Sequence, residues 1–295
     1  MTTVSLQSLN AADEAGFVGA LGDIYEHAPW VAQAVYGQRP FASLAALHAA
    51  MVAAVRAAPP ARRMSLIEGH PDLAGKAARA GLLTADSTAE QSSAGLDRLS
   101  DVEFAQFHRL NDAYRAKFGI PFIVCVRRHG KDSILRQFEL RLRNDVAAEN
   151  EAALGEIARI TALRLDQRVT APDRLNVHGR LSTHVLDTHG GKPASGVTIE
   201  LFELSAGGER SLIVRTTTNR DGRTDEPLMS GRPLPVARYE LRFHVAAYFA
   251  AMGTAQPEPP FLDEVPVRFA IAEPEGNYHV PLLVTPWSYS TYRGS

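Results

Sequence analysis

Residues 197–204 read VTIELFEL, and apolar side chains alternate with polar ones along this stretch. Alternation with a period of two is the pattern of a strand that buries one of its faces in a core. A Ser-Ala-Gly-Gly turn occupies 205–208, and residues 212–218 (LIVRTTT) resume the strand pattern. The pair predicts two successive strands in this part of the chain.

The same strand pattern recurs toward the C-terminus. Further strands are predicted at 239–245, 265–271 and 278–285, with one short helix at 248–252. Asn219-Arg-Asp-Gly222 predicts a turn, because Asp-Gly readily supplies the positive φ that a tight turn needs. Several short strands at this spacing favour a β-sandwich.

Before residue 170 the apolar residues recur at helical spacing instead. Phe17, Ala20, Leu21 and Ile24 share one helix face, and Asn10 is a candidate cap for that helix. Further helices are predicted along 104–118, where Gly119 stands at a C-cap position, from 132 onward, and through 154–165. No strand pair is expected here. The fold class is therefore an all-α domain followed by a β-sandwich.

The length of 295 residues favours two domains. We place an all-α domain at 1–168, a linker at 169–176, where Pro172 cannot continue a regular helix, and a β-sandwich domain at 177–295.

Composition excludes several classes of protein. Thirty-one Lys and Arg against 33 Asp and Glu give a net charge of −2, with no basic excess for nucleic acid or an anionic membrane. The longest apolar runs, such as 49–55, fall far short of the roughly 20 residues of a membrane span. The N-terminus lacks the pattern of a secretory signal, and Cys125 is the one cysteine. We expect a cytoplasmic protein.

Three side chains of the β half suit catalysis. They are His184 in LSTHVLD (181–187), Arg223 in NRDGR (219–223) and His279 in NYHVPLL (277–283), and the chain ends in YSTYRGS (289–295). Each has a structural alternative as well: a hydrogen-bonded strand histidine, a surface arginine, a frayed terminus. A zinc site on His184 and His279 is a third reading. Catalytic zinc usually takes three protein ligands, and the other histidines of this half (His178, His189 and His244) have no informative spacing.

Taken together, LSTHVLDT, NRDGR, YHVPLL and the terminal YSTYRGS resemble the 5-hydroxyisourate hydrolases, which are related to transthyretin. The resemblance runs from about Leu181 to Ser295 and implies a homotetramer of β-sandwiches with active sites at a subunit interface. It implies four catalytic residues and three that complete the terminal motif. The catalytic set is His184, Arg223, His279 and Ser295, and the others are Tyr292, Arg293 and Gly294. Asn277 departs from the family, which often has another histidine there.

The α half has one dense stretch, EGHPDLAGK (68–76), followed by 83–91 and 94–97. Read by spacing alone, Ser87-x-x-Glu90 favours a capping box that begins a helix, as does Ser100-x-x-Glu103. By the same reading His70-Pro71 is a loop joint and Arg164 an exposed helix residue.

HPDLAGKAA, STAEQ, AGLD and LNDAYRAKFGIPFI resemble the 2-oxo-4-hydroxy-4-carboxy-5-ureidoimidazoline (OHCU) decarboxylases, and IYEHAPW (24–30) fits that family too. The resemblance covers about Ser5 to Arg168 and implies an all-helical, commonly dimeric enzyme without a cofactor. It implies His70, Glu90 and Arg164 as catalytic residues. It also implies a pocket lined by Pro71, Gln91, Phe118, Gly119, Ile120, Pro121, Phe122 and Ile123. We expect Glu90, a cap residue turned toward the pocket, to orient His70 and to favour its imidazolium form.

The two halves together resemble the fused bifunctional enzymes known as allantoin synthases. This implies that the C-terminal domain hydrolyses 5-hydroxyisourate to OHCU, and that the N-terminal domain decarboxylates OHCU to S-allantoin and CO₂. The partners expected are these two small molecules and further copies of the chain, without nucleic acid, membrane, metal or cofactor. The alternative is a transthyretin-like binding protein with a degenerate helical domain; a scaffold that only oligomerises is a third class.

Overall fold

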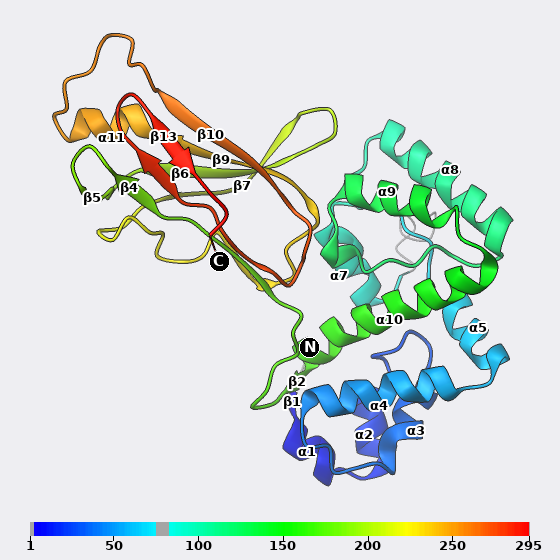
Figure 1. Cartoon of the computed structure of the whole chain (residues 1–295). Helices are drawn as coiled ribbons and strands as arrows, with labels where there is room; N and C mark the ends of the chain where they lie inside the picture. The colour runs from blue at the N-terminus through cyan, green and yellow to red at the C-terminus, as the bar shows by residue number, and fades with distance from the viewer. Residues whose placement is uncertain (1–2, 75–82, 295) are drawn as a thin grey trace. The chain divides into compact units, whose positions relative to one another are not determined.

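The computed structural model describes residues 3–74 and 83–294, and the chain divides into two compact units. The first unit comprises Met1–Arg127 and Ser133–Val177, and the second comprises Arg128–Asp132 and His178–Ser295. Figure 1 shows helices along the first part of the chain and mostly strands along the rest. The predicted order, a helical domain followed by a β domain, is confirmed.

The helical unit is built from short and medium helices around one long one, α10. They are α1 (Leu6–Ala11), α2 (Glu14–Leu21), α3 (Trp30–Tyr36), α4 (Leu44–Ala57), α5 (Pro60–Glu68), α7 (Ala85–Ser93), α8 (Asp101–Phe118), η1 (Val126–Arg128), α9 (Lys131–Arg141) and α10 (Val146–Arg168). No single helix in residues 3–74 and 83–294 is long and apolar enough to cross a membrane; only α4 and α5 together, bent by 113°, pass that test of length and composition.

Local sequence explains where α8 begins and ends. Ser100 and Glu103 form a complete capping box, so the predicted cap at this helix is confirmed. At the other end Gly119 has a φ of +74°, a left-handed conformation that glycine adopts without strain, and its N–H bonds to the carbonyl of Arg115. The aromatic face of α8 packs into the core, where Phe107 and Tyr114 are fully buried.

Two expectations for the N-terminal region were wrong. Asp13, not Asn10, caps α2, because its carboxylate accepts the N–H of Gly16. Asn10 lies inside α1 and bonds instead to the backbone of Phe41. A short parallel strand pair also exists, β1 (Val4–Ser5) with β2 (Val169–Thr170). Pairs of two residues are too short to leave a period-two pattern.

The β unit contains three sheets and one short helix, α11 (Val245–Ala251). One sheet has the order β10-β9-β6-β7, the second β11-β3-β8 and the third β13-β12-β4-β5. The strands are β3 (Gly179–Ser182), β4 (Val185–Asp187), β5 (Lys192–Pro193), β6 (Thr198–Leu204), β7 (Arg210–Thr217), β8 (Met229–Arg232), β9 (Ala237–His244), β10 (Glu264–Ile271), β11 (Asn277–His279), β12 (Leu282–Val284) and β13 (Tyr289–Thr291).

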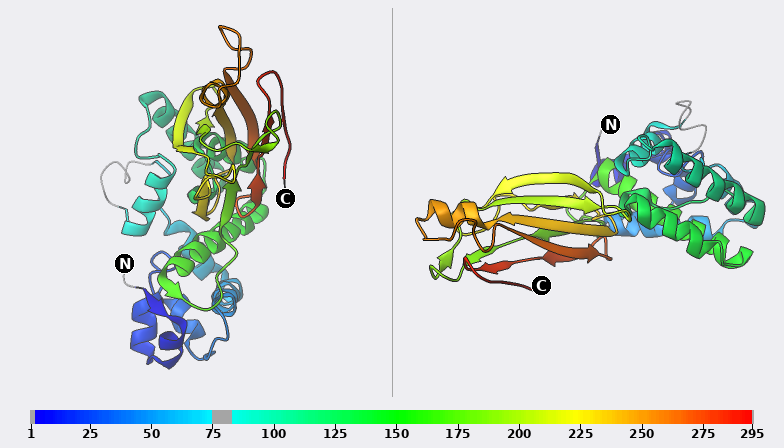
Figure 2. Two further views of the ribbon diagram at one scale, coloured as in Figure 1. Left: turned by 90° about the vertical axis from the view of Figure 1, so that its left-hand side faces the viewer. Right: turned by 90° about the horizontal axis from the view of Figure 1, so that it is seen from above.

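Strands of the β11-β3-β8 sheet lead directly into strands of the β13-β12-β4-β5 sheet. Together these two sheets form one layer, which faces the β10-β9-β6-β7 sheet (Figure 2). Strand β3 is followed by β4 after only two residues, Thr183 and His184, and β11 by β12 after Val280 and Pro281. The Thr183 hydroxyl donates to the carbonyl of Val280 at 2.7 Å, which joins the two interruptions. His184 therefore lies at a break between strands rather than within one strand.

Alternation in β6 produces the predicted buried face. Ile199 and Leu201 are fully buried, whereas the alternating residues Thr198, Glu200 and Phe202 are only partly buried. The polar tail is not frayed through residue 291, because β13 pairs antiparallel with β12. Sequence missed this strand and β8, since neither has alternating apolar residues.

A buried charge network braces the helical unit. Glu149 on α10 has no solvent exposure and accepts from Nε of Arg141 at 2.8 Å and from the Tyr114 hydroxyl. Arg141 in turn donates to the carbonyl of Ile123 and lies 4.7 Å from the centroid of the Phe122 ring. A buried charge is tolerated only when it is paired and hydrogen-bonded, so these contacts also fix the backbone at residues 122–123.

We expect Glu149→Gln to destabilise the helical unit by about 3–5 kcal/mol, because it leaves the Arg141 charge buried without its partner. The matched control is Glu151→Gln, which removes an ion pair with Arg56 in which both side chains are more than half exposed; its expected cost is below about 1 kcal/mol. Denaturant unfolding followed by far-UV circular dichroism measures both. Equal costs would show that the buried network carries no special weight.

Candidate active sites

Three segments of the helical unit bring His70, Glu90 and Arg164 to one place. His70 directly follows the end of α5, Glu90 lies on α7, and Arg164 lies on the buried face of α10. Helix α7 begins where it does because the Thr84 side chain accepts the N–H of Ser87. The capping box predicted from Ser87 and Glu90 is wrong, since Thr84 is the cap and Glu90 is free to turn toward α10.

Arg164 is flanked by two carboxylates. Its Nε and Nη2 donate to the two oxygens of Glu90 at 2.8 and 2.9 Å, a bidentate geometry. Its Nη1 lies 2.9 Å from Oε2 of Glu26. The exposed fractions of the three side chains are 5%, 13% and 2% for Arg164, Glu90 and Glu26. Arg164 is therefore a buried charge that is fully engaged within the protein, not an exposed helix residue.

The backbone of α5 orients His70. Its Nδ1 lies 2.9 Å from the carbonyl oxygen of Leu66, which only accepts hydrogen bonds, so Nδ1 carries the proton. In the neutral ring Nε2 then has the free lone pair. The expectation that Glu90 orients His70 is wrong, because both oxygens of Glu90 bond to Arg164.

Burial lowers the pKa of His70 below its ordinary value. The Leu66 carbonyl and the Glu26 carboxylate oppose this shift, whereas the charges of Arg164 and His27 add to it. The expected imidazolium form is therefore also wrong near neutral pH, since desolvation outweighs the nearby carboxylate.

The two carboxylates shift in opposite directions. Burial raises the pKa of Glu90 although Arg164 opposes it, and the negative charges of Glu26 and Asp86 raise it further. Burial acts on Glu26 in the same sense, but Arg164 and the Thr84 hydroxyl outweigh it and lower the pKa of Glu26. Of the pair, Glu90 is the carboxyl that more readily takes up a proton.

His70, Glu90 and Arg164 line a small cavity of about 30 Å³. Of the residues predicted from sequence, it brings together His70, Pro71, Glu90, Gln91, Phe122, Ile123 and Arg164. The others (Phe118, Gly119, Ile120 and Pro121) lie at the end of α8 and just beyond it, outside this lining. Ser87, Val124 and Val126 also line the cavity, and sequence reasoning did not assign them to a site.

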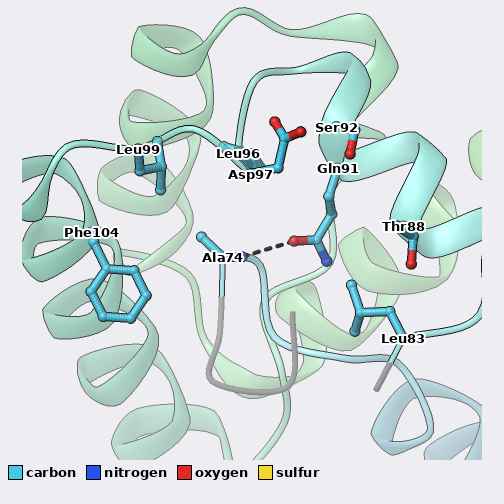
Figure 3. A pocket seen from close by; sticks show the side chains of 9 residues that line it. All are labelled: Ala74, Leu83, Thr88, Gln91, Ser92, Leu96, Asp97, Leu99 and Phe104. Carbon is cyan, nitrogen blue, oxygen red and sulfur yellow. Dashed lines mark hydrogen bonds between the residues drawn. The ribbon is translucent and has the colours of Figure 1, made fainter. Parts of the chain in front are cut away.

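Gln91 also borders a larger cavity of about 280 Å³, shown in Figure 3. Its side-chain oxygen accepts the N–H of Ala74 at 3.0 Å, and Ala74 has a φ of +51°. The carbonyl of Leu73 accepts from Asn111 at 2.8 Å. Two amide side chains thus hold the strained backbone that follows His70-Pro71.

In the β unit, His184 and Arg223 face each other across an isolated antiparallel bridge. The N–H of Val185 donates to the carbonyl of Gly222 at 2.8 Å, which fixes their separation. Nε2 of His184 is buried and has no hydrogen-bond partner among residues 3–74 and 83–294. The backbone of Asp221 interacts with the His184 ring and opposes the lowering of its pKa. Nε2 is therefore the ring nitrogen left available to a proton or a ligand.

His279 lies beside the C-terminal tail. It forms an isolated bridge with Gly294, whose N–H donates to the His279 carbonyl at 2.8 Å. Nδ1 of His279 lies 3.0 Å from the hydroxyl of Ser182. Tyr292 and Arg293 are largely exposed, and Arg293 lies 4.9 Å from the centroid of the Tyr278 ring. Ser295 lies outside the described residues.

Two glycines permit this close packing. A Cβ on Gly222, whose φ is +70°, would lie 2.3 Å from the carbonyl oxygen of Val185 and 3.1 Å from the His184 ring. A Cβ on Gly294 would lie 2.8 Å from Cδ2 of His279. Both contacts are shorter than a side chain tolerates, so the turn and the tail need glycine where they approach the histidines.

Arg223 acts electrostatically on both histidines. Burial lowers the pKa of His184, and the charge of Arg223 lowers it further. Burial, Arg223 and then His184 lower the pKa of His279. The three side chains thus form one electrostatic cluster, in which both imidazoles are neutral near neutral pH. Asn277 is exposed at the start of β11.

Among residues 3–74 and 83–294, no group of three or more His, Cys, Asp or Glu side chains is placed to hold a metal ion. His244, one of the histidines considered for zinc, lies 3.2 Å from carboxylate oxygens of both Glu200 and Glu264. Cys125 is buried, as its apolar context predicts.

The fold and site residues of each part define a known class of protein. The sequence profile of the OHCU decarboxylase family matches residues 10–166, and that of the HIUase/Transthyretin family matches residues 181–294. The chain therefore belongs to the OHCU decarboxylase family and, through its C-terminal part, to the HIUase/Transthyretin family.

Individual relatives match either part or the whole. The 2-oxo-4-hydroxy-4-carboxy-5-ureidoimidazoline decarboxylase of Halalkalicoccus jeotgali is 40% identical over 172 residues, which are 58% of this chain and 95% of that protein. The 5-hydroxyisourate hydrolase 2 of Rhizobium meliloti is 53% identical over 117 residues, 40% of this chain and 97% of that protein. A crystal structure of (S)-allantoin synthase matches 99% of this chain and 100% of its own, with 35% identity and a TM-score of 0.53.

The cluster predicts that Arg223→Gln raises the pKa of both His184 and His279 toward the ordinary histidine value, because a nearby positive charge is removed. The control is Arg215→Gln, an exposed arginine of β7 that pairs with Glu200. NMR titration of the imidazole carbon-bound protons measures each pKa. A response of only one histidine, or an equal response to the control, would contradict the cluster.

Proposed function

We propose that this chain catalyses two consecutive steps of urate breakdown: hydrolysis of 5-hydroxyisourate to OHCU in the β unit, then decarboxylation of OHCU to S-allantoin and CO₂ in the helical unit. The observation that carries the proposal is that one chain holds both sets of site residues. It matches an (S)-allantoin synthase structure over practically its full length. The two family matches support each activity separately.

For the hydrolysis we assign the base to a neutral imidazole. One of His184 and His279 removes a proton from water, the resulting hydroxide attacks the ring carbonyl, and the acyl–nitrogen bond breaks as the departing nitrogen takes up a proton. The lone pair of the buried, unpartnered His184 Nε2 suits an acceptor of this kind. Arg223 is placed to stabilise the developing negative charge. Ser295, Tyr292 and Arg293 complete the proposed substrate site.

For the decarboxylation the substrate supplies its own electron sink. The carbon–carboxylate bond breaks, CO₂ leaves, the electron pair passes into the conjugated imine of the ring, and a proton is then added to one face of a ring carbon. We assign the proton transfers to His70 and Glu90, because burial lowers the pKa of His70 and raises that of Glu90, so that the two values approach each other. No cofactor is required for this chemistry.

Arg164 acts in this proposal mainly through Glu90. Glu90 and Glu26 engage Nε, Nη1 and Nη2, and Nη1 and Nη2 also approach the Ile24 carbonyl and the Ser87 hydroxyl at 3.5 Å, so a substrate carboxylate competes with these contacts for Arg164. The cavity of about 30 Å³ holds one or two waters. Gln91 lines both this cavity and the larger one of about 280 Å³.

The proposal predicts that single substitutions separate the activities. His70→Ala should abolish most of the decarboxylation and leave hydrolysis of 5-hydroxyisourate intact, and His279→Ala should do the reverse, because the two clusters share no residue. Urate oxidase supplies 5-hydroxyisourate, absorbance follows its decay, and circular dichroism follows formation of optically active allantoin. Each variant is the control for the other.

Two outcomes of that assay would count against the proposal. If folded wild-type protein accelerated neither decay, a binding protein of the transthyretin type would be the better interpretation. If either substitution removed both activities equally, the two sites would not be independent.

We further propose a homo-oligomer, with a tetramer formed by the β units and dimer contacts by the helical units. Several large side chains near the tail are about half exposed, which supports a partner at this surface; they are Trp287, Tyr289 and Tyr292. Analytical ultracentrifugation should give a multiple of the 32.0 kDa chain, and a monomer at micromolar concentration would contradict the proposal.

We also propose a cytoplasmic location. A single buried, free cysteine is in keeping with a reducing compartment. Fractionation of the source cells, with the protein found in the soluble cytoplasmic fraction, is the corresponding test.

A further inference from the structure

Glu26 is buried beside the proposed decarboxylase site. It lies between α2 and α3, and its side chain is 2% exposed. It borders a cavity of about 370 Å³ that also contacts Arg164, whereas the small cavity with His70 has Arg164 but not Glu26 in its lining. In the sequence Glu26 is one residue of the segment IYEHAPW. Nothing in its spacing sets it apart.

The contacts of Glu26 join three segments. One carboxylate oxygen accepts from Arg164 on α10 at 2.9 Å. The Thr84 hydroxyl donates to Glu26 at 2.7 Å and the Ser87 hydroxyl at 3.1 Å, both from the start of the helix that carries Glu90. Glu26 therefore holds the guanidinium and the start of α7 in register with each other.

The backbone around Glu26 is strained as well. His27, the next residue, has a φ of +51°, a left-handed conformation that few residues other than glycine adopt. Such conformations persist only where the surrounding contacts impose them, and they cluster at functional sites. The contacts of Glu26 with Arg164, Thr84 and Ser87 are of that kind.

We propose that Glu26 is a positioning residue for the decarboxylation: it fixes Arg164, and through Arg164 the carboxylate of Glu90, and it supplies the negative charge that His70 and Glu90 experience. This inference rests on the proposed decarboxylase function of the helical unit. Glu26 itself does not contact the reacting atoms.

Charge counting supports the assignment. With both carboxylates ionised, Glu26, Glu90 and Arg164 carry a net charge of −1, which disfavours an anionic substrate unless Glu90 takes up a proton. Glu26 compensates Arg164 and so makes a protonated Glu90 easier to form. The lowered pKa of Glu26 keeps Glu26 itself ionised.

The charged groups around this site come from five segments: α10, α7, η1, the α2–α3 loop and the loop after α5. His70 faces Glu26, Arg164 and His27, and Glu90 faces Arg164, Glu26 and Asp86. Arg168 contacts Asp86 at 3.5 Å and Asp23 at 2.7 Å, and Arg127 borders the cavity on the Glu90 side of Arg164. Of these groups, Glu26 and Glu90 are the two that form ion pairs with Arg164.

The charge of Glu26 should set the pH range in which decarboxylation is fastest. The Glu26 charge raises the pKa of both His70 and Glu90. In Glu26→Gln both pKa values fall, so both limbs of a bell-shaped kcat/KM profile for decarboxylation should move to lower pH. Because Arg164 is also held less firmly, kcat should fall about 10- to 100-fold.

The test measures kcat, KM and the pH profile of decarboxylation in the full chain for Glu26→Gln and Glu26→Asp. The aspartate keeps the charge, so its profile should stay at the wild-type pH although the shorter side chain lowers kcat. The matched control is Asp166→Asn. Asp166 is a buried carboxylate on α10 that accepts from Arg174 at 3.0 Å and does not line the cavity with His70. Asp166→Asn should lower the free energy of unfolding without shifting the pH profile of decarboxylation.

Hydrolysis of 5-hydroxyisourate and far-UV circular dichroism report whether each variant is intact. An unshifted profile with wild-type kcat in Glu26→Gln would overturn the inference. If that variant does not fold, wild-type kcat in Glu26→Asp would overturn it instead. Absence of decarboxylation in the wild-type protein would refute the proposed function itself, so the two failures are distinguishable.

Discussion

The buried guanidinium of Arg164 is the constraint on which the helical site depends. A charge at this depth is stable only with partners, and Arg164 has two, the carboxylates of Glu90 and Glu26. These ion pairs tie α10 to α7 and to the loop after α2. They also explain why Glu90 neither caps its helix, as local spacing suggested, nor orients His70, as was expected from the family resemblance. The guanidinium of Arg164 therefore determines where the carboxylates of Glu90 and Glu26 lie.

Both proposed sites use neutral imidazoles, but they obtain them differently. Burial accounts for most of the lowered pKa of His70, and the Leu66 carbonyl fixes the position of its proton. In the β unit His184 and His279 are less enclosed, and the charge of Arg223 acts on both. A neutral ring can accept a proton, as the water-activating base of the proposed hydrolysis must.

Sequence predicted the architecture well because its signals are local. Period-two alternation located β6, β9 and β10, and the Ser100–Glu103 box with Gly119 located α8. Strands of two or three residues, such as those of the tail, leave no such signal. The family resemblance supplied His70, Glu90 and Arg164, which the structure brings together. The resemblance did not predict which of these side chains form ion pairs with one another. Glu26 and Arg164, for example, are 138 positions apart in the sequence, and only the fold brings them together in the buried interior.

The central claim is that His70 is neutral and carries its proton on Nδ1, in a site whose acidic side chains are arranged around Arg164. Nitrogen-15 NMR of histidine-labelled protein, with His70 assigned by comparison with the His70→Ala variant, measures this directly. At pH 7 the account predicts a protonated Nδ1 and an unprotonated Nε2. Protonation of both nitrogens, or a proton on Nε2 alone, would contradict it.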